Sequence, residues 1–350
     1  FFNPNLQNNF RQKQDMLNFP IPTVDKQALE ELIASRRALS TVALAQELDF
    51  FSTFANGTFT INQVADRLNL SSRAAEAMVA VIAALGFLST EPDLHFRLTD
   101  LAQTYLLPES TFYQGLIVPK NDTLLCQLRE AFLQNDDKPI EPFAVEMANL
   151  PLVQVENFID RMHKMTLPAG SKLAQQPVFA RIENLLDVGG GSGSLSLAIA
   201  SFNPKIHCTI LDLPSVCRIA DRNIRQYNLS NQIDTIAIDI FKDRWPPNVD
   251  GILFGNIFHD WDLDTCYQLA KRSFDVLKSG GWICLHEMLL NESKDGPLVP
   301  ACMSIAMILH ERGKQYTSTE LSDILTAAGF NDFKVTSVFG YYSLVTARKP

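Results

Sequence analysis

The stretch Asn184–Gly193 reads NLLDVGGGSG and decides the fold. Its residues Leu185, Leu186 and Val188 form a short apolar run, which is typical of a strand buried on both faces of a parallel sheet. Four glycines follow this run, and the small and apolar residues up to Ala200 predict a helix. A strand, a glycine turn and a helix in this order bring the backbone close to a nucleotide-like ligand.

The glycines do not by themselves name that ligand. A dinucleotide-binding turn has the spacing G-x-G-x-x-G, whereas the register that starts at Gly189 puts Ser194 at the last glycine position. The pattern is better written D-x-G-x-G-x-G with an acid leading, and a carboxylate there can hold a cationic amino group such as that of a methionine moiety. We therefore expect cofactor contacts at Asp187, Gly189, Gly190, Gly191 and Gly193.

The composition limits the function classes. The chain has 350 residues, enough for two domains, and its 46% hydrophobic and 20% charged residues are ordinary for a globular protein. A net charge of −9 disfavours nucleic acid as the main partner. The six cysteines form no CxxC pair and no zinc-like spacing, so we expect reduced thiols, no metal and a cytoplasmic location. Without a signal-peptide core or a membrane-length apolar run, we expect no membrane partner.

The first part of the chain has a winged-helix pattern. A long helical periodicity over residues 27–51 precedes two shorter helical patterns, the second of which ends at Gly86, and GFLSTEP and HFRLTD then predict a hairpin wing. The helix that would enter DNA, SSRAAEAMVAVIAALG, carries only Arg73 and Glu76 as charges, which argues against DNA binding. Because this helix is apolar on nearly every side, we expect it to be buried against another subunit of a homodimer.

A further helix is predicted from Val153 to Met165, before the glycine turn. Two of its residues, Met162 and Met165, can form a flexible apolar wall for a small substrate, because methionine fills irregular gaps. A helix packed in a domain interface is the alternative interpretation.

Polar residues follow the second and third predicted strands, at the edge where open α/β sheets bind ligands. HCTILDLP ends in Asp212, followed by Leu213, and the Asp212 carboxylate can accept hydrogen bonds from ribose hydroxyls. IDTIAIDIF carries Asp239 and Ile240 near its end, where an adenine amino group can be bound. A turn or helix cap is the alternative for Asp239.

The fourth predicted strand, DGILFGNIFHDW, delivers His259 to the same edge. A neutral imidazole there can take up a proton near pH 7. We assign Asn256 and Trp261 to the cofactor and Asp260 to the substrate, with ordinary packing as the alternative for Trp261.

The chain after this strand completes the predicted sheet and its cover. Gly280–Gly281 is expected to turn the chain into a fifth strand, WICLHEML, which brings Glu287 to the edge where it can orient His259. An apolar helix over residues 298–312 would lie over the crevice. Its candidate substrate contacts are Met303, Met307 and His310, although an apolar stripe of this kind is more often part of the core. The two last strands are joined by so short a connection that they must pair antiparallel.

With these motifs in order, the chain resembles the S-adenosylmethionine-dependent O-methyltransferases of the plant caffeate and bacterial polyketide type. The similarity runs from GFL and RLTD, through LLDVGGGSG, LDLP, IDIF and FHDW, to TSTELSDILTAAGF and the antiparallel tail. It implies a homodimer held by the N-terminal domain, whose helices help to wall the partner's acceptor pocket. It also implies His259 as general base beside Glu287, with cofactor contacts at Gly189, Gly191, Asp212, Asp239 and Ile240.

The chain departs from that family at one position. The family often has a second acid beside the base, whereas the segment RGKQYT puts Gln315 there. A glutamine can hold an imidazole by a hydrogen bond but cannot stabilise an imidazolium by charge.

We therefore predict a Rossmann-like methyltransferase domain over residues 181–350, with a mixed seven-stranded sheet and an antiparallel last strand. A mainly α winged-helix-like dimerisation domain is predicted over residues 1–118, and a helical linker that contributes to the substrate pocket over residues 119–180. The predicted reaction transfers a methyl group from S-adenosylmethionine to an oxygen of a small aromatic, enolic or polyketide-like molecule, leaving S-adenosylhomocysteine. S-, N- or C-methylation is the main alternative; an NAD-dependent dehydrogenase and a non-catalytic cofactor-binding regulator are remote ones.

Overall fold

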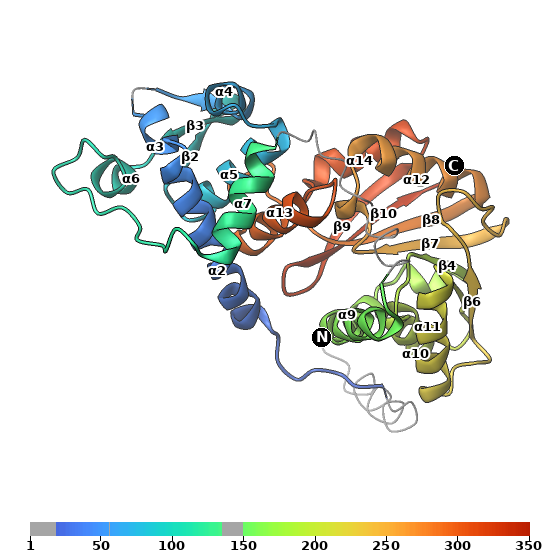
Figure 1. Ribbon diagram of the computed structural model, residues 1–350. Coiled ribbons are helices and arrows are strands. Elements are labelled where there is room, and N and C mark those ends of the chain that lie inside the picture. The colour runs from blue at the N-terminus through green and yellow to red at the C-terminus, as the bar shows by residue number, and fades with distance from the viewer. Residues whose placement is uncertain (1–18, 56, 135–149) are drawn as a thin grey trace, which may run out of the picture.

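The computed structural model describes residues 19–55, 57–134 and 150–350 of the chain. A mainly helical N-terminal part lies beside a seven-stranded sheet that is flanked by helices (Figure 1). The predicted domain ranges include residues 1–18 and 135–149, which lie outside the described residues.

The N-terminal part combines helices with a small antiparallel sheet of order β1-β3-β2. Thr60 begins α4 with a capping box that includes Gln63, and the Ser71 side chain accepts the Ala74 N–H at the start of α5. The elements are α2 (Gln27–Glu47), α3 (Phe50–Thr53), β1 (Phe59–Thr60), α4 (Ile61–Leu68), α5 (Ser72–Ala84), β2 (Leu88–Glu91), η1 (Pro92–Leu94), β3 (His95–Leu98), α6 (Asp100–Tyr105) and α7 (Thr123–Leu133).

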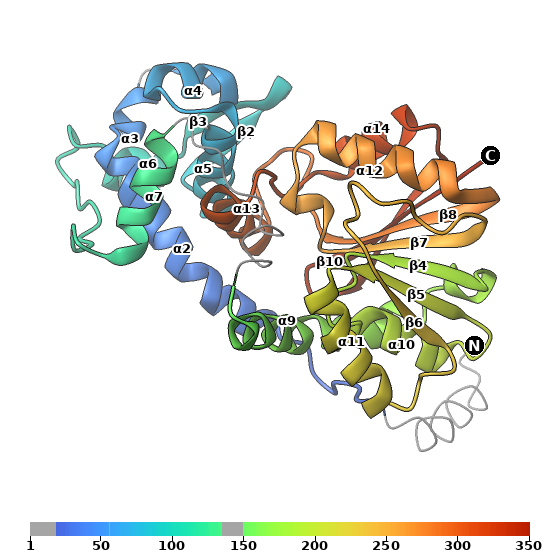
Figure 2. The same ribbon diagram turned by 45° about the vertical axis from the view of Figure 1, so that its right-hand side comes forward.

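The apolar helix α5 is buried within its own chain, so the expectation that another subunit buries it was wrong. Its residues Ala75, Met78 and Ile82 share one core with α2 and with the C-terminal helix α13 (Leu298–His310). In both views α13 lies against the N-terminal helices (Figures 1 and 2). The sequence pattern identified a buried helix correctly but not the segment that covers it.

The large sheet has the order β6-β5-β4-β7-β8-β10-β9, with the last two strands antiparallel to their neighbours. Helices α9, α10 and α11 cover one face, and α12 and α14 cover the other (Figure 2). The remaining elements are α9 (Leu152–Leu173), η2 (Phe179–Arg181), β4 (Asn184–Val188), α10 (Ser194–Phe202), β5 (His207–Asp212), α11 (Pro214–Gln226), β6 (Ile233–Ala237), β7 (Val249–Gly255), η3 (Phe258–Asp260), α12 (Leu263–Val276), β8 (Leu277–Met288), α14 (Ser318–Ala327), β9 (Asn331–Phe339) and β10 (Tyr342–Arg348). The mixed sheet with antiparallel closing strands is as predicted.

Two strand boundaries differ from the prediction. Strand β7 ends at Gly255, so His259 lies on the short 3₁₀ helix η3 that follows the strand. Strand β8 already begins at Leu277, so Gly280–Gly281 lies inside it. The pairing of β7 with β8 shifts register near these glycines, and Gly280 has a φ of +80°. The glycines therefore form an irregularity within the strand and not the turn before it.

The helix α13 was expected to lie over the ligand crevice, but it mainly joins the two parts of the chain. Its residues Val299, Cys302 and Ile305 are buried in the core of the N-terminal part. A helix that is apolar on nearly all sides needs cover on several sides, and α2 and α5 supply it. Met303 is half-buried, Met307 is buried and His310 is exposed, and their contact with a substrate stays a prediction.

Candidate active site

The glycine turn lies at the carboxyl end of β4 and leads into α10. Gly189, Gly191 and Gly193 have φ values of +68°, +59° and +78°, which side-chain-bearing residues rarely adopt. A Cβ at Gly190 would lie 2.8 Å from the Asp187 carboxylate, whereas a Cβ at Gly191 would meet nothing within 4 Å. The turn is therefore tightly packed beneath and open at Gly191, which suits close approach of a ligand to the backbone.

Asp187 supports the turn from below. Its side chain is buried, with 1% of the residue exposed, and accepts a 2.6 Å hydrogen bond from the Ser196 hydroxyl on α10. Burial raises the pKa of Asp187 to about 6. The carboxylate thus lies under the turn, and its contact with the cofactor, direct or through water, stays a prediction.

Asp212 lies at the end of β5, beside the turn. Its carboxylate accepts the Gly191 N–H at 2.8 Å and the Leu213 N–H at 2.7 Å. Burial raises the pKa of Asp212 to about 6, although these two donors favour the charged form. Asp212, which we expect to bind the ribose, thus lies next to Gly191, where the backbone of the turn is open.

Two helices hold the turn through Ser192, and the sequence did not predict these contacts. On α9, His163 Nδ1 lies 2.9 Å from the Ser192 hydroxyl, and burial lowers the pKa of His163. On α11, the Asn223 side-chain amide donates to the Ser192 carbonyl at 3.0 Å. No local pattern marks these residues, because their partner comes from a distant segment.

Asp239 and Ile240 follow β6 and sit at the neighbouring part of the edge. The Asp239 carboxylate accepts the Phe241 N–H at 2.9 Å and pairs with Lys242 at 2.7 Å, and the hydrogen bond from Lys242 lowers its pKa. The Phe241 ring packs edge-on against Trp261 with centroids 4.6 Å apart. Trp261 therefore packs beside the segment that carries Asp239.

His259 is held by a carboxylate that is itself fixed on both oxygens. Its Nδ1 lies 2.5 Å from Glu287 Oε2, and Glu287 Oε1 accepts the N–H groups of Ile257 and Phe258 at 3.0 Å each. The neighbouring carboxylate of Asp260 has its Oδ1 3.3 Å from His259 Nε2. Because Glu287 accepts from Nδ1, the neutral ring carries its lone pair on Nε2.

The charges around His259 decide its protonation. Burial opposes a charge on the ring, but the carboxylates of Glu287 and Asp260, with a smaller contribution from Glu311, outweigh it and raise the pKa to about 9. Burial also raises the pKa of Asp260 to about 6. The group is thus a strong proton acceptor placed between two carboxylates.

Gln315 is buried but makes no side-chain hydrogen bond. Its backbone N–H donates to the Ser304 hydroxyl at 3.0 Å, whereas both atoms of its side-chain amide are buried without a partner. Among the described residues the His259 ring is held by Glu287 and Asp260 and not by Gln315, whose part in the catalytic group stays a prediction.

The remaining predicted residues surround this centre. Asn256, at the end of β7, has a φ of +58° and donates its N–H to the His286 carbonyl at 3.0 Å. On α9, Met162 is half-buried and Met165 is 41% exposed, so both retain surface that a substrate can contact. No group of metal-ligating side chains occurs in the part of the chain that the structure describes.

Known O-methyltransferases are similar to this chain in sequence and in fold. The O-methyltransferase domain family matches residues 153–331. The 3-hydroxy-5-methyl-1-naphthoate 3-O-methyltransferase of Streptomyces sahachiroi is 30% identical over 87% of this chain and 90% of its own length. Human N-acetylserotonin methyltransferase, solved with S-adenosylmethionine, has a TM-score of 0.58 and 25% identity over 94% of this chain and 99% of that one. A Planctomyces limnophilus O-methyltransferase family 2 protein solved with apigenin shares the fold, with a TM-score of 0.86 and 23% identity over 95% of this chain and 98% of that one.

The fold and the glycine-turn site define a class, the Rossmann-like methyltransferases. Within that class the chain belongs to the S-adenosylmethionine-dependent O-methyltransferase family. S-adenosylmethionine is its cofactor, and the open backbone at Gly191 beside the Asp212 carboxylate fits the ribose of that molecule. Over the described ranges, no helix is both long and apolar enough to cross a membrane.

Proposed function

We propose that the chain methylates a hydroxyl of a small aromatic or polyketide-like molecule, with His259 as the general base. The observation that carries this proposal is the 2.5 Å contact between His259 and Glu287 at the ligand edge of the sheet. A base oriented by a fixed carboxylate is the arrangement that proton removal from a hydroxyl requires.

Bound S-adenosylmethionine supplies the electrophilic methyl group. The glycine turn and Asp212 would hold its nucleoside end, and Asp239 and Ile240 after β6 would contact its adenine. His259 Nε2 takes the acceptor proton, and the resulting imidazolium lies between the Glu287 and Asp260 carboxylates. Positioning contributes roughly 7–11 kcal/mol to such reactions, and a general base adds roughly 10²–10⁴-fold.

The acceptor class is supported by the names of the relatives. The Streptomyces relative acts on a hydroxynaphthoate, and the human relative acts on N-acetylserotonin, both of which have an aromatic ring. The flexible Met162 and Met165 on α9 can pack against flat rings of different sizes. S-, N- and C-acceptors remain the alternative, because thiolates and carbanion-like carbons need less help from a base.

The test compares His259→Gln with the unchanged protein. We expect turnover of a hydroxyl acceptor to fall by roughly 10²–10⁴-fold, because no other neutral base is held at this place. Affinity for S-adenosylhomocysteine, measured by calorimetry, should stay the same, because His259 lies outside the glycine turn. Near-normal turnover of the variant would exclude His259 as the base. Full loss of cofactor affinity would indicate that the substitution disturbs the fold.

We also propose that the N-terminal domain over residues 1–118 forms a homodimer and that residues 119–180 link it to the methyltransferase domain over residues 181–350. The support comes from α2, where Leu29, Leu32, Ile33 and Leu39 are between 49% and 70% exposed. The first three are spaced at i, i+3 and i+4, so they form one apolar stripe on the helix.

A further inference from the structure

The turn that carries His259 is held by a loop from elsewhere in the sequence, residues 311–316. Arg312 and Gly313 donate their N–H groups to the Asp260 carbonyl at 3.1 and 3.0 Å. The Tyr316 hydroxyl donates to the Trp261 carbonyl at 2.6 Å. Three bonds thus join the 311–316 loop to the backbone carbonyls of Asp260 and Trp261, next to the Asp260 carboxylate.

The packing between this loop and the turn leaves no free space. A Cβ at Gly313 would lie 2.1 Å from the His259 carbonyl oxygen and 2.5 Å from the Trp261 nitrogen. The loop also carries Glu311, one of the carboxylates that favour the charged form of His259. A displacement of the loop therefore changes both the position and the surroundings of the imidazole.

The 311–316 loop is in turn held by Arg73 from the first turn of α5. Arg73 Nη1 donates to the carbonyls of Glu311 at 2.8 Å and Gly313 at 3.1 Å, with the Met307 carbonyl at 3.4 Å. A planar guanidinium with several donors suits such a cluster of carbonyls better than an ammonium group does. The N-terminal part thus contacts the loop that packs against the turn carrying His259.

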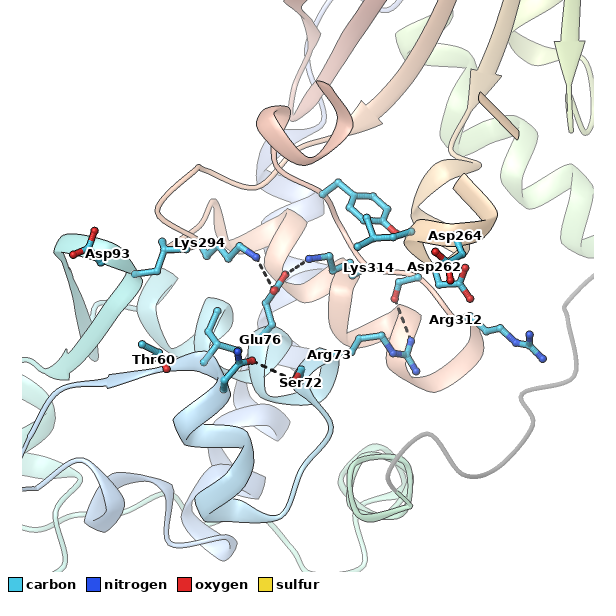
Figure 3. Close-up of a pocket in the computed structure, with 16 residues that line it drawn as sticks. Thr60, Ser72, Arg73, Glu76, Asp93, Asp262, Asp264, Lys294, Arg312 and Lys314 are labelled. Atoms are coloured by element: carbon cyan, nitrogen blue, oxygen red, sulfur yellow. Dashed lines mark hydrogen bonds and ion pairs between the residues drawn. The ribbon is translucent and has the colours of Figure 1, made fainter. Parts of the chain in front are cut away.

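A cluster of four charges anchors the other side of the same loop. Lys314 pairs with Glu76 on α5 and with Glu320 on α14, at 2.6 Å each. Lys294 pairs with the same two carboxylates at 2.6 and 3.0 Å. Glu76 and the two lysines line a cleft of about 710 Å³ between the wing and α12, where Glu76 points toward both lysines (Figure 3). Arg73 and Glu76, the two residues by which the N-terminal part holds the loop, therefore both lie on α5.

We propose that Arg73 is a positioning residue for the reaction, and that the N-terminal domain sets the place of His259 through the 311–316 loop. This inference rests on the proposed role of His259. Arg73 holds the loop carbonyls, the loop N–H groups hold the Asp260 carbonyl, and Asp260 and Glu311 face the imidazole together with Glu287. Loss of the guanidinium removes one of the two anchors of the loop on α5 and lets Asp260 and Glu311 shift relative to His259.

The experiment compares Arg73→Met and Arg73→Lys in the full chain. We expect Arg73→Met to lower kcat by about 10²-fold, because small misplacements of reacting groups have effects of that size. Arg73→Lys should recover part of the loss, since an ammonium can still bind the carbonyls. Affinity for S-adenosylhomocysteine should not change, because the glycine turn is not part of this network.

A readout on His259 itself separates positioning from a general loss of stability. We expect NMR titration of the imidazole to show a lower pKa in Arg73→Met than in the unchanged protein, because carboxylates move away from the ring. The matched control is Arg97→Met, which removes an arginine of the exposed wing pair with Glu91 and should change neither kcat nor the titration.

The outcomes distinguish the two proposals. An unchanged His259 titration and unchanged kcat in Arg73→Met would overturn the positioning role. If His259→Gln keeps its turnover while Arg73→Met still shifts the His259 titration, the base assignment fails and the connection through the loop stands.

Discussion

His259 and Glu287 give the site a pH dependence whose direction follows from their contact. The raised pKa near 9 means that the free protein holds His259 largely protonated at neutral pH, while the base must be neutral. We expect kcat/KM to rise with pH up to about 9. In Glu287→Gln one of the two main carboxylates is lost, so the apparent pKa should fall toward 6.5 and the maximal rate should fall roughly tenfold or more.

The measurement is the pH profile of kcat/KM for both proteins. Glu91→Gln, in the exposed wing pair, is the matched control and should keep the profile of the unchanged protein. A profile in Glu287→Gln that coincides with that of the unchanged protein would show that another group titrates.

His286 makes a second prediction at this scale, about stability. Its ring is fully buried and stacked on Tyr342 with centroids 4.6 Å apart, and neither nitrogen has a hydrogen-bond partner among the described residues. Burial lowers its pKa from 6.5 to about 3. Between these values the unfolded chain binds a proton that the folded chain does not, so stability is lost as pH falls below 6.5.

The test measures urea unfolding at pH 7 and pH 5 in the unchanged protein and in His286→Phe. The variant keeps a stacking ring without a titrating group. Between pH 7 and pH 5 its free energy of unfolding should therefore fall by about 2 kcal/mol less than that of the unchanged protein. Equal losses in the unchanged protein and His286→Phe would contradict the prediction.

The sequence located His259 and Glu287 because strand order alone brings the ends of neighbouring parallel strands together. It could not locate Arg73 or the contact of His163 with Ser192, since both depend on segments that meet only in the folded chain. Asp187 shows a third case: its position in the motif was clear, but whether it faces the ligand or the helix beneath was not readable from spacing.

At the scale of elements, two neighbouring glycines of the turn are needed for different reasons: Gly190 for lack of space and Gly191 for its positive φ. Gly190→Ala would place a Cβ 2.8 Å from the Asp187 carboxylate, so we expect clear destabilisation. In Gly191→Ala the added Cβ has no described atom within 4 Å. The only cost is the strain of an alanine at a φ of +59°, about 1–2 kcal/mol. Urea unfolding shows which of the two variants loses more free energy of unfolding. A larger loss for Gly191→Ala than for Gly190→Ala would contradict the packing described at the turn.

Elements with a clear period or cap were predictable, and their covers were not. The helix α5 and the antiparallel pairing of the closing strands follow from the local sequence pattern. Thr317 and Glu320 form a capping box that begins α14, as their spacing of three residues indicates. The cover of α5 by α13 could not be foreseen, because apolar pattern says that a face is buried but not by which segment. Gly280–Gly281 was placed before β8 because a glycine pair is typical both of a turn and of an irregularity inside a strand.

At the scale of the whole molecule, the exposed stripe on α2 predicts self-association. We expect Leu32→Glu, which puts a charge in the middle of the stripe, to shift the protein toward monomer in sedimentation velocity runs. Leu101→Glu on α6 is the control, because Leu101 is 49% exposed and lies off the stripe. Dimers of undiminished strength in Leu32→Glu would place the interface elsewhere.

The position of α13 in the N-terminal core also governs how the chain folds during synthesis. The apolar α5 leaves the ribosome long before residues 298–310, its cover, have been made. At roughly 5–20 residues per second the delay is on the order of 10–45 s. Throughout that time the nascent N-terminal part shows an apolar surface, so it is a natural client for chaperones, and the chain becomes competent only when its last third has been translated.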